Sequence, residues 1–525
     1  MFAENHCFFG IFADILNVNI DNKTNMKTLF RGLSFFVVVV MLCVTTLCSC
    51  DKEEKHDFKF EAPGRIYSKP GATQVIPFIA HNISSMSVTA KPKGWTVDKV
   101  DMQNWTITVT APDAYSDDTN KYEENGLLKV TGYTAAGTVI YISSYLSLQN
   151  KAVDITDIYS NSYIISEPDT RYIIDVTHIG ETSQKITPAD AKVLWQSDSK
   201  LINYCEFKPE DGTFSFFVGS KEIKDSYGRV EKLVVPQGNA VVAAYDNDGN
   251  ILWSWHLWLT PEIVEEKLIA TSAEVFMDRN LGAYSNSAGS KSGDDIYNSY
   301  GLFYQWGRKD PFVGPRDYNF SANSDCYMYT AAGGYTNIKY VDAKTDTEGS
   351  KYQVGTMEYA IANPLSFVLG SENNDYDWIY SSHDNSLWSS SEKSVNDPCP
   401  RGWRVPKAGT FNSFDIAEAE DLADLEAVRG AYGWNLVDKY AGVSMFMPGA
   451  GRRSYQTGVL TNMNNYGYDN VPMPWVGHYW TAGVIGTQAE SMFFDLNTTR
   501  AVNNRYEPAK KMYRANAMQV RCVRE

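Results

Sequence analysis

The sequence predicts a multidomain protein built mostly from β-strands, with two β-sandwich modules ahead of a larger C-terminal domain. The chain has 525 residues, which corresponds to about three or four domains. Aromatic residues, which favour strands, make up 13% of it. As far as residue 262, short runs with the apolar–polar alternation of half-buried strands are separated by turn-forming segments. From residue 275 onward, glycine and aromatic residues are dense and helical periodicity is scarce.

Composition and charge exclude several classes of protein. Apolar residues make up 43% and charged residues 21% of the chain, close to the average for soluble globular domains. These values argue against a largely disordered chain and against a membrane protein with many spans. The net charge of −16 repels nucleic acid and anionic lipid surfaces. It is compatible with neutral sugars, divalent cations or basic protein partners, and no nucleic-acid partner is expected.

The segment before residue 60 has the layout of a secretory signal. Residues 33–47 (LSFFVVVVMLCVTTL) are uncharged and strongly apolar, and Lys27 and Arg31 precede them. A run of this length is short for a bilayer span of about 20 residues. We therefore assign residues 26–49 as a signal peptide and residues 50–60, which are charged and lack periodicity, as a tether.

Residues 1–25 do not fit this layout. They contain Asp14 and Asp21 and no basic residue before Lys23. Met26 followed by a lysine is a better start for a signal peptide. We interpret the first 25 residues as an N-terminal extension of doubtful status.

The end of the apolar run resembles the lipobox of bacterial lipoproteins. The matching residues are Leu47-Cys48-Ser49-Cys50. The resemblance implies that Cys50 becomes the new N-terminus and carries a diacylglycerol, which would anchor the chain in the outer membrane. The charged stretch 51–55 is similar to surface-export signals of Bacteroidota lipoproteins. It implies exposure at the cell surface.

Two Ig-like β-sandwiches are predicted, at residues 61–150 and 151–262. In the first, residues 105–110 (WTITVT) alternate apolar and polar side chains. Residues 92–95 (PKGW), followed by residues 105–112, are similar to bacterial Ig-like modules of the BACON type. Trp95 is expected to fill the core of this module rather than to form a ligand platform.

The clearest hairpin of the second module lies at residues 240–259. Its two apolar runs are separated by residues 246–250 (DNDGN), and Asp-Gly in this position is a strong turn signal. Asp246 and Asp248 also match the start of a calcium loop. Because the remaining ligands and the distal Glu are missing, a turn is expected here rather than a calcium site.

The second strand of this hairpin carries three tryptophans and one histidine. Trp253 and Trp255 share one face of the strand and are predicted to fill the core. His256 falls on the other face, with Trp258. We interpret His256 as a structural residue with satisfied hydrogen bonds rather than as a ligand.

Six short strings stand out in the C-terminal domain. They are residues 275–282 (VFMDRNLG), 301–308 (GLFYQWGR), 398–406 (PCPRGWRVP), 447–453 (MPGAGRR), 477–482 (GHYWTA) and 518–523 (MQVRCV). These strings resemble the FISUMP family, the "Fibrobacter succinogenes major paralogous" domain. Their order matches the family pattern, although Phe276 replaces the usual Trp of the first string. The resemblance implies an α+β fold over residues 263–525, of the C-type-lectin-like or sulfatase-modifying-factor-like kind.

Within this domain, one helix and one disulfide are expected. Apolar residues recur at three- and four-residue steps over residues 408–430, with acidic residues opposite, which predicts a helix. Outside the leader the cysteines are Cys205, Cys326, Cys399 and Cys522, and sequence alone allows three full pairings of four cysteines. The family resemblance implies a Cys399–Cys522 bridge and two free thiols.

No catalytic residue, metal site or cofactor is predicted. G-x-S-x-G, H-E-x-x-H and P-loop motifs are missing from the sequence. Glu372, Asp375 and Asp377 cluster near Trp378, and we favour an exposed acidic loop over a calcium site or a catalytic carboxylate pair. The reactive-cysteine chemistry of the formylglycine-generating fold is not carried over. The sugar-binding strings of calcium-dependent lectins are also absent, so calcium-mediated sugar binding is not expected.

The predicted binding surface is a loop within residues 454–475. This stretch is rich in Asn, Tyr and Gly and lacks the apolar stripe that a core element requires. Aromatic faces together with amide groups suit a sugar, and Tyr and Asn are also typical of protein-binding loops. An ordered loop without a ligand is the alternative. The candidate contacts are Asn464, Asn465, Tyr466, Tyr468, Asp469 and Trp475.

Together these features predict a lipid-anchored cell-surface binding protein, either an adhesin or a fimbria-associated protein. Its C-terminal lectin-like domain would bind a glycan or a host or surface protein. One alternative is an enzyme, a hydrolase or oxidoreductase on the formylglycine-generating-like fold. Another is a structural fimbrial subunit, which needs an unpaired edge strand for strand addition.

The lipobox gives the first testable prediction. Metabolic labelling with a fatty acid is expected to mark the wild-type protein and not the Cys50→Ala variant, because the thiol of Cys50 is the predicted acylation site. Labelling is measured after immunoprecipitation. Equal labelling of both proteins would contradict the lipoprotein assignment.

Overall fold

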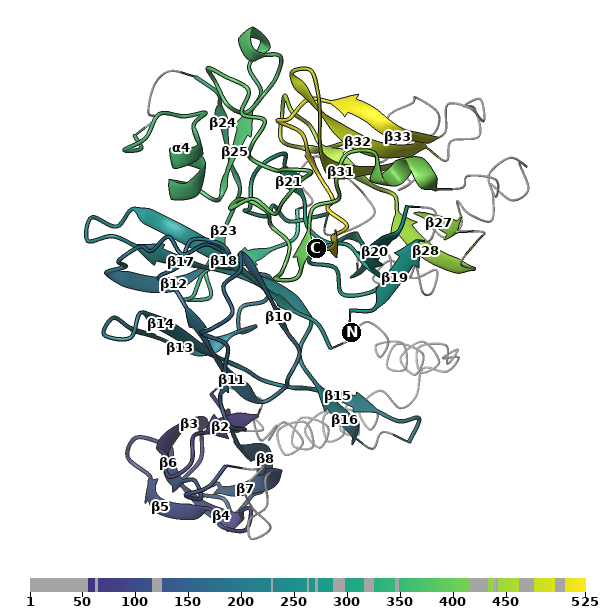
Figure 1. The fold of residues 1–525 in the computed structure, drawn as a ribbon. Helices are drawn as coiled ribbons and strands as arrows, with labels where there is room; N and C mark the ends of the chain where they lie inside the picture. The colour runs from purple at the N-terminus through teal and green to yellow at the C-terminus, as the bar shows by residue number, and fades with distance from the viewer. Residues whose placement is uncertain are drawn as a thin grey trace, which may run out of the picture. The chain divides into compact units, whose positions relative to one another are not determined.

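The computed structural model describes most of the chain from Lys55 onward (Figure 1). The doubtful extension, the predicted signal peptide and Cys50 lie outside the described residues, and their assignments stay predictions. Within the described residues, no helix has the length and apolar character needed to cross a membrane. The structure describes residues 55–61, 65–115, 125–227, 230–261, 264–269, 272–286, 298–315, 325–344, 349–414, 433–438, 440, 442–461, 476–495 and 506–525.

The first of two compact units contains Thr73–Thr110 and Gly126–Tyr145. Together with adjoining residues, this unit forms two facing four-stranded sheets within residues 57–148, as the sequence predicts. The Phe58 ring of one sheet packs on Gly132 of the other so closely that a Cβ there would lie 2.7 Å from the ring. Trp95 is buried, as expected. The first sheet has the order β1 (Asp57–Phe60), β3 (Thr73–His81), β6 (Thr106–Thr110), β5 (Thr96–Asp101), and the second β2 (Ile66–Ser68), β8 (Val139–Leu148), β7 (Asn125–Tyr133), β4 (Ser85–Ala90).

The predicted tether is shorter than expected. Strand β1 begins at Asp57, inside the segment 50–60, and pairs with β3. Phe58 and Phe60 alternate with Asp57 and Lys59, so both phenyl rings are buried while the charged side chains face outward. Burial of two aromatic rings explains why these residues join the sandwich.

The second unit contains Leu146–Glu525 and begins with the second predicted sandwich. Two sheets face each other across a core that includes Trp253, Trp255, Tyr172 and Phe216. The Asp-Gly segment forms a turn, with Asp246 accepting backbone N–H bonds from Asp248 and Asn250. One sheet has the order β10 (Ser162–Ile165), β18 (Ile251–Leu259), β17 (Gly238–Tyr245), β12 (Asp190–Gln196), and the other β13 (Asn203–Lys208), β14 (Thr213–Val218), β11 (Thr170–Asp175), β9 (Val153–Asp154).

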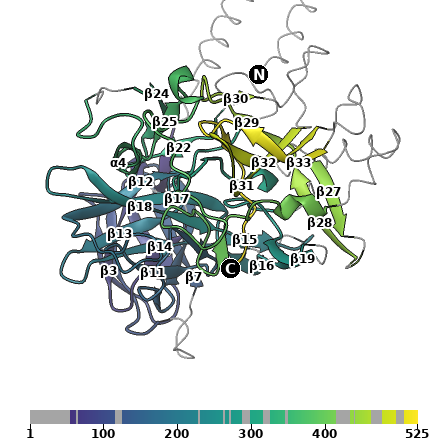
Figure 2. The same ribbon diagram turned by 45° about the horizontal axis from the view of Figure 1, so that its top comes forward.

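Strands β17 and β18 are buried on both faces. In the views of Figures 1 and 2 they lie between the sheet that contains β11, β13 and β14 and the C-terminal segment around α4 (Met357–Ala362). Trp253 and Trp255 belong to the sandwich core, and Trp258 belongs to the core of the C-terminal residues. The sequence predicted separate domains at 151–262 and 263–525, but the structure packs them as one compact unit.

The two parts also share a sheet and a buried polar network. Strand β12 pairs with β22 (Met328–Tyr329), which pairs with β23 (Tyr335–Thr336), so the sheet extends into the C-terminal region. Lys309 and Asp310, both buried, bind Ser254 of β18, with each donor–acceptor distance to the Ser254 hydroxyl at 2.6 Å. This polar network explains why the boundary expected near residue 262 does not separate two cores.

The six family-like strings meet in two sheets of the C-terminal region. In the first, β20 (Glu274–Met277) and β26 (Trp403–Arg404) pair with β35 (Val523–Arg524) on opposite sides. β19 (Glu266–Ile269) completes this sheet. The other strings contribute to a seven-stranded sheet. Its order is β21 (Tyr304–Gln305), β34 (Ala517–Met518), β29 (Ala450–Arg453), β31 (Val476–Ile485), β32 (Gln488–Asp495), β33 (Tyr506–Met512), with β30 (Leu460–Thr461) beside β29.

The described part of the C-terminal region contains less helix than an α+β fold implies. Its described helical elements are short: α4, η2 (Glu372–Asn374) and η3 (Thr410–Ser413). Of the helix predicted at 408–430, η3 is a 3₁₀ turn whose Phe411 ring packs on Phe276, and residues 415–430 lie outside the described residues. The remaining strands are β24 (Lys339–Asp342) with β25 (Ser366–Leu369), β27 (Gly433–Asp438) with β28 (Val443–Pro448), and β15 (Lys221–Lys224) with β16 (Val230–Val234).

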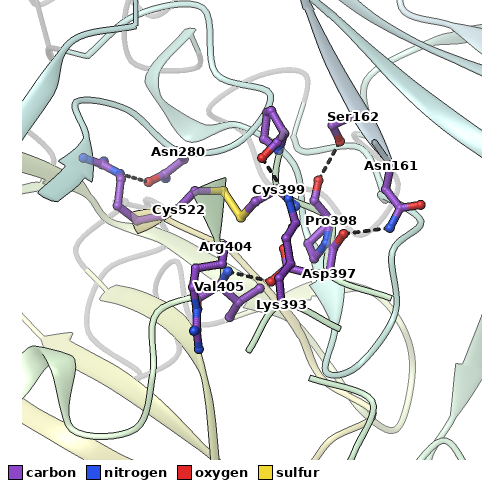
Figure 3. The surroundings of a disulfide bond; sticks show 12 residues. Asn161, Ser162, Asn280, Lys393, Asp397, Pro398, Cys399, Arg404, Val405 and Cys522 are labelled. Atoms are coloured by element: carbon purple, nitrogen blue, oxygen red, sulfur yellow. Dashed lines mark hydrogen bonds between the residues drawn. A yellow bond between two sulfur atoms is a disulfide. The ribbon is translucent and has the colours of Figure 1, made fainter. Parts of the chain in front are cut away.

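The structure forms the Cys399–Cys522 disulfide that the family resemblance implies (Figure 3). Both cysteines are fully buried. Asp397 accepts backbone N–H bonds from Cys399 at 2.9 Å and Val405 at 2.8 Å. Ser162 of β10 donates to the carbonyl of Pro398 at 2.6 Å. The bridge therefore joins the C-terminus to a segment that also contacts the second sandwich. Cys205 and Cys326 take part in no disulfide.

Loss of the disulfide is expected to destabilise the protein. The bond closes a loop with a sequence separation of 123 residues, and removal of a native disulfide costs about 2–5 kcal/mol. The double variant Cys399→Ser/Cys522→Ser should lose about this much unfolding free energy in urea denaturation. Cys205→Ser, at an exposed free thiol, is the control and should stay within about 0.5 kcal/mol of the wild type. An unchanged midpoint in the double variant would contradict the prediction.

A candidate ligand-binding groove

The candidate contacts of the predicted binding loop lie outside the described residues. Asn464, Asn465, Tyr466, Tyr468, Asp469 and Trp475 all fall within 462–475, so their role stays a prediction. The first part of the predicted stretch 454–475 is described and ends with β30. Val459, just ahead of β30, lines a surface pocket.

Two surface pockets adjoin each other in the second unit. We call the pair the tyrosine groove. The first pocket has a volume of about 370 Å³ and the second about 380 Å³, and they share Cys326 and Tyr327 as a common wall. Residues that line the first include Trp195, Ser197, Asp198, Gln237, Asn239 and Tyr284. Residues that line the second include Tyr335, Thr336, Asn337, Ile338, Tyr340 and Val459.

Tyr327 and Tyr335 form one aromatic wall of the second pocket, and Tyr329 packs beside them. The ring of Tyr327 lies 5.4 Å from Tyr335, and Tyr335 lies 5.0 Å from Tyr329, between centroids. A side-chain hydrogen bond with Tyr335 raises the pKa of Tyr329 above its usual value. Tyr327 is 48% and Tyr335 65% exposed. The rings thus support one another while presenting aromatic surface to solvent.

Tyr340 also lines the second pocket and is held in place by its neighbours. Gly458 has a left-handed backbone with φ of +69°, and a Cβ there would lie 2.2 Å from the Tyr340 ring. Arg453, which is fully buried, donates to Gly458 O at 3.0 Å, Tyr340 Oη at 3.4 Å and Asp325 Oδ1 at 2.7 Å. Tyr340 is nevertheless 42% exposed. Its orientation is fixed before any ligand arrives.

Trp195 reaches the groove through a β-bulge. The register of β12 against β17 shifts between Val193 and Trp195. Without the shift these two side chains would share a face, since they are two residues apart. Instead Val193 packs in the sandwich core and Trp195 in the C-terminal core, where it lines the first pocket.

The polar floor of the first pocket is organised around Asn239. Its Nδ2 donates to Gly282 O at 3.0 Å and to Tyr284 Oη at 3.1 Å. Its Oδ1 must therefore be an acceptor, and His256 Nε2 donates to it at 2.9 Å. Ser162 Oγ lies 3.2 Å from the other ring nitrogen. His256 is thus a buried structural residue, as predicted, and it fixes the amide that lines the groove.

Burial lowers the pKa of His256 to about 3. No carboxylate is among its hydrogen-bond partners, which are an amide oxygen and a hydroxyl. Desolvation therefore disfavours the charged imidazolium in the folded protein. The neutral ring keeps one N–H for Asn239.

The acidic cluster near Trp378 differs from the exposed loop that the sequence predicts. Glu372 is exposed on η2, but Asp377 is buried. His383 Nδ1 lies 3.0 Å from Asp377 Oδ2, and Arg514 lies 3.6 Å from the same oxygen. Burial raises the pKa of Asp377. These two basic partners compensate the cost of burying the Asp377 carboxylate, which explains why it lies inside the protein. Within the described residues no group of three or more His, Cys, Asp or Glu is arranged to hold a metal ion.

The sequence contains a signal for the tyrosines of the groove. Residues 326–340 (CYMYTAAGGYTNIKY) carry four tyrosines on both sides of a Gly-Gly turn. Aromatic residues that flank a glycine turn are typical of a hairpin. The periodicity of this segment does not show that its tyrosines lie beside Asn239 and Trp195, which come from the second sandwich.

Comparisons with known proteins do not identify the chain. No protein-family profile matches it, and no curated protein matches it. A tandem of titin Ig domains is 12% identical over 39% of this chain and 98% of that chain, with a TM-score of 0.13. The Bacteroides ovatus mixed-linkage glucan utilization locus protein SGBP-B, in complex with a mixed-linkage heptasaccharide, is 10% identical over 41% of this chain and 49% of that chain, with a TM-score of 0.13.

A further match is a nucleoside hydrolase-related protein from Saccharophagus degradans that is associated with carbohydrate metabolism. It is 11% identical over 18% of this chain, with a TM-score of 0.12, and the match spans 25% of that protein. At these TM-scores the matches establish neither a shared fold nor a shared function.

The buried histidine predicts how stability depends on pH. Between pH 6.5 and 3 the unfolded chain binds a proton at residue 256 that the folded chain excludes, so unfolding free energy falls as the pH is lowered. His256→Gln keeps a donor for Asn239 but does not titrate. From pH 7.5 to pH 4.5, the stability difference between wild type and variant should shift by about 3 kcal/mol in favour of the variant.

This shift is measured by urea denaturation at each pH. Burial raises the pKa of Asp397 to about 6, so this residue changes the unfolding free energy with pH in the opposite direction. Because Asp397 is present in both proteins, its effect cancels in the difference between them. His81→Gln changes an exposed histidine and serves as the control. If the difference in unfolding free energy between wild type and His256→Gln stays constant across this pH range, His256 is not held neutral.

Proposed function

We propose that this protein is a lipid-anchored cell-surface protein that binds glycans in the tyrosine groove. The observation that carries the proposal is a set of three part-exposed tyrosines around one pocket, with amide and hydroxyl groups beside them. Aromatic rings stack on the C–H faces of sugars, and amides pair with hydroxyl groups. Ligand sites generally combine apolar walls with a few placed polar groups in this way.

The rigidity of the walls supports a binding role. Exposed aromatic surface is costly unless it meets something, and contiguous apolar patches commonly mark interaction sites. Here Tyr340 is oriented by Arg453 and Gly458, and Tyr327 and Tyr335 are oriented by each other. A preorganised site loses less side-chain freedom on binding, which favours affinity.

The anchor and the family assignment complete the proposal. Acylation of Cys50 would hold the chain at the outer membrane, with the first sandwich between the anchor and the groove-bearing unit along the chain. We propose the FISUMP assignment and the C-type-lectin-like fold for the C-terminal region on the strength of its six strings. The candidate contacts at 464–475 remain a second proposed set of binding residues. Weak contacts of this kind suit an adhesin that acts through many copies.

The proposal predicts that the groove tyrosines carry binding. Each stacked aromatic contributes about 0.5–1.5 kcal/mol beyond burial. Tyr327→Ala/Tyr335→Ala should therefore weaken binding to a polysaccharide array at least fivefold without a change in melting temperature. Affinity is measured with the mature protein on neutral and acidic polysaccharides and on mucin. Tyr141→Ala, at a tyrosine that is 76% exposed in the first unit, is the matched control.

Two results would contradict this assignment. If Tyr466→Ala/Trp475→Ala abolishes binding while the groove variant binds normally, the predicted loop is the site and the groove is not. If the protein binds no glycan but is retained on a protein component of mucin, its ligand is a protein.

A further inference from the structure

We infer that the tyrosine groove binds the interior of a polysaccharide chain and not a terminal sugar. The inference rests on the proposed function and deepens it. Its basis is the relation of the two pockets, which share Tyr327 and Cys326 as their common wall. The volume of each pocket alone is at the lower end of the range for small-ligand sites, which is about 300–1,000 Å³.

The position of Tyr327 makes it a platform between two subsites. Its neighbours along the chain are fixed: Cys326 N donates to Gly314 O at 2.9 Å, and Met328 is buried at 3% exposure. Side chains alternate along an extended strand, so Tyr327 faces outward between these two residues. Because the two pockets meet at this ring, a chain that stacks on it extends from one pocket into the other.

This arrangement suits a sugar unit that has neighbouring sugar units on both sides. A sugar in the middle of a chain would place the preceding and following units in the two pockets. A terminal sugar on the same ring would leave one pocket unoccupied. Neither pocket is enclosed, so a chain can enter and leave the groove.

Each pocket offers an amide on its own side of Tyr327. Gln237 lines only the first pocket, and Asn337 lines only the second. Gln237 is half-buried and Asn337 is exposed. These two residues therefore allow each subsite to be weakened separately, with chemically similar substitutions that leave the cores untouched.

The test measures how affinity depends on ligand length in the full mature protein, purified in detergent. Cello-, manno-, xylo- and malto-oligosaccharides of two to six units are titrated by calorimetry, after a screen on the corresponding polysaccharides. In the series that binds, the hexasaccharide should bind at least tenfold more tightly than the disaccharide. Gln237→Ala and Asn337→Ala should each weaken hexasaccharide binding at least threefold, and their effects should add because the residues occupy separate pockets.

The outcomes separate this inference from the proposed function. If the disaccharide binds as tightly as the hexasaccharide, or if one of the two amide variants has no effect on the hexasaccharide, the site takes a chain end and the inference is wrong while glycan binding stands. If no polysaccharide binds, both the proposed function and the inference are wrong. Melting temperatures of both variants, expected to equal that of the wild type, exclude a loss of folding as the cause.

Discussion

The structure of the second unit depends on the burial of the β17–β18 hairpin on both faces. One face packs Trp253 and Trp255 into the sandwich core, and the other packs Trp258 into the C-terminal core. The second face also carries His256, whose Nε2 donates to Asn239. Ser162 lies beside its other ring nitrogen and donates to Pro398 O. These polar contacts help to specify how the two parts fit together.

The groove follows from the same packing. Since β22 and β23 add to the sheet beside β12, the tyrosines of the C-terminal region are placed at the edge of the sandwich sheet. The bulge before Trp195 turns that ring toward them. The pocket therefore needs both parts of the unit, and its amide floor is anchored by His256 in the interface between them.

The residues that carry the family resemblance are mainly structural. Asp278 and Arg279 form a buried ion pair, with two contacts of 2.8 Å, and Arg521 donates to Asn280 at 2.8 Å. These groups come from the first and last strings, whose strands pair in one sheet beside the disulfide. A scaffold fixed in this way can present variable loops, which is where binding residues are usually found. The resemblance therefore bears on the fold more than on the ligand.

The sequence by itself determined the local features. Alternation predicted the first sandwich and the faces of Trp253 and His256, the Asp-Gly pair predicted the hairpin turn, and the family-like strings implied the disulfide. Only the tertiary structure decided that residues 151–262 and the C-terminal region share one unit, that Asp377 is buried, and that Tyr327 lies beside Asn239. The reason is physical: periodicity reports which residues of one element share a face, but not which distant element covers that face. A bulge or a buried ion pair changes which element covers a side chain without changing the periodicity of the sequence.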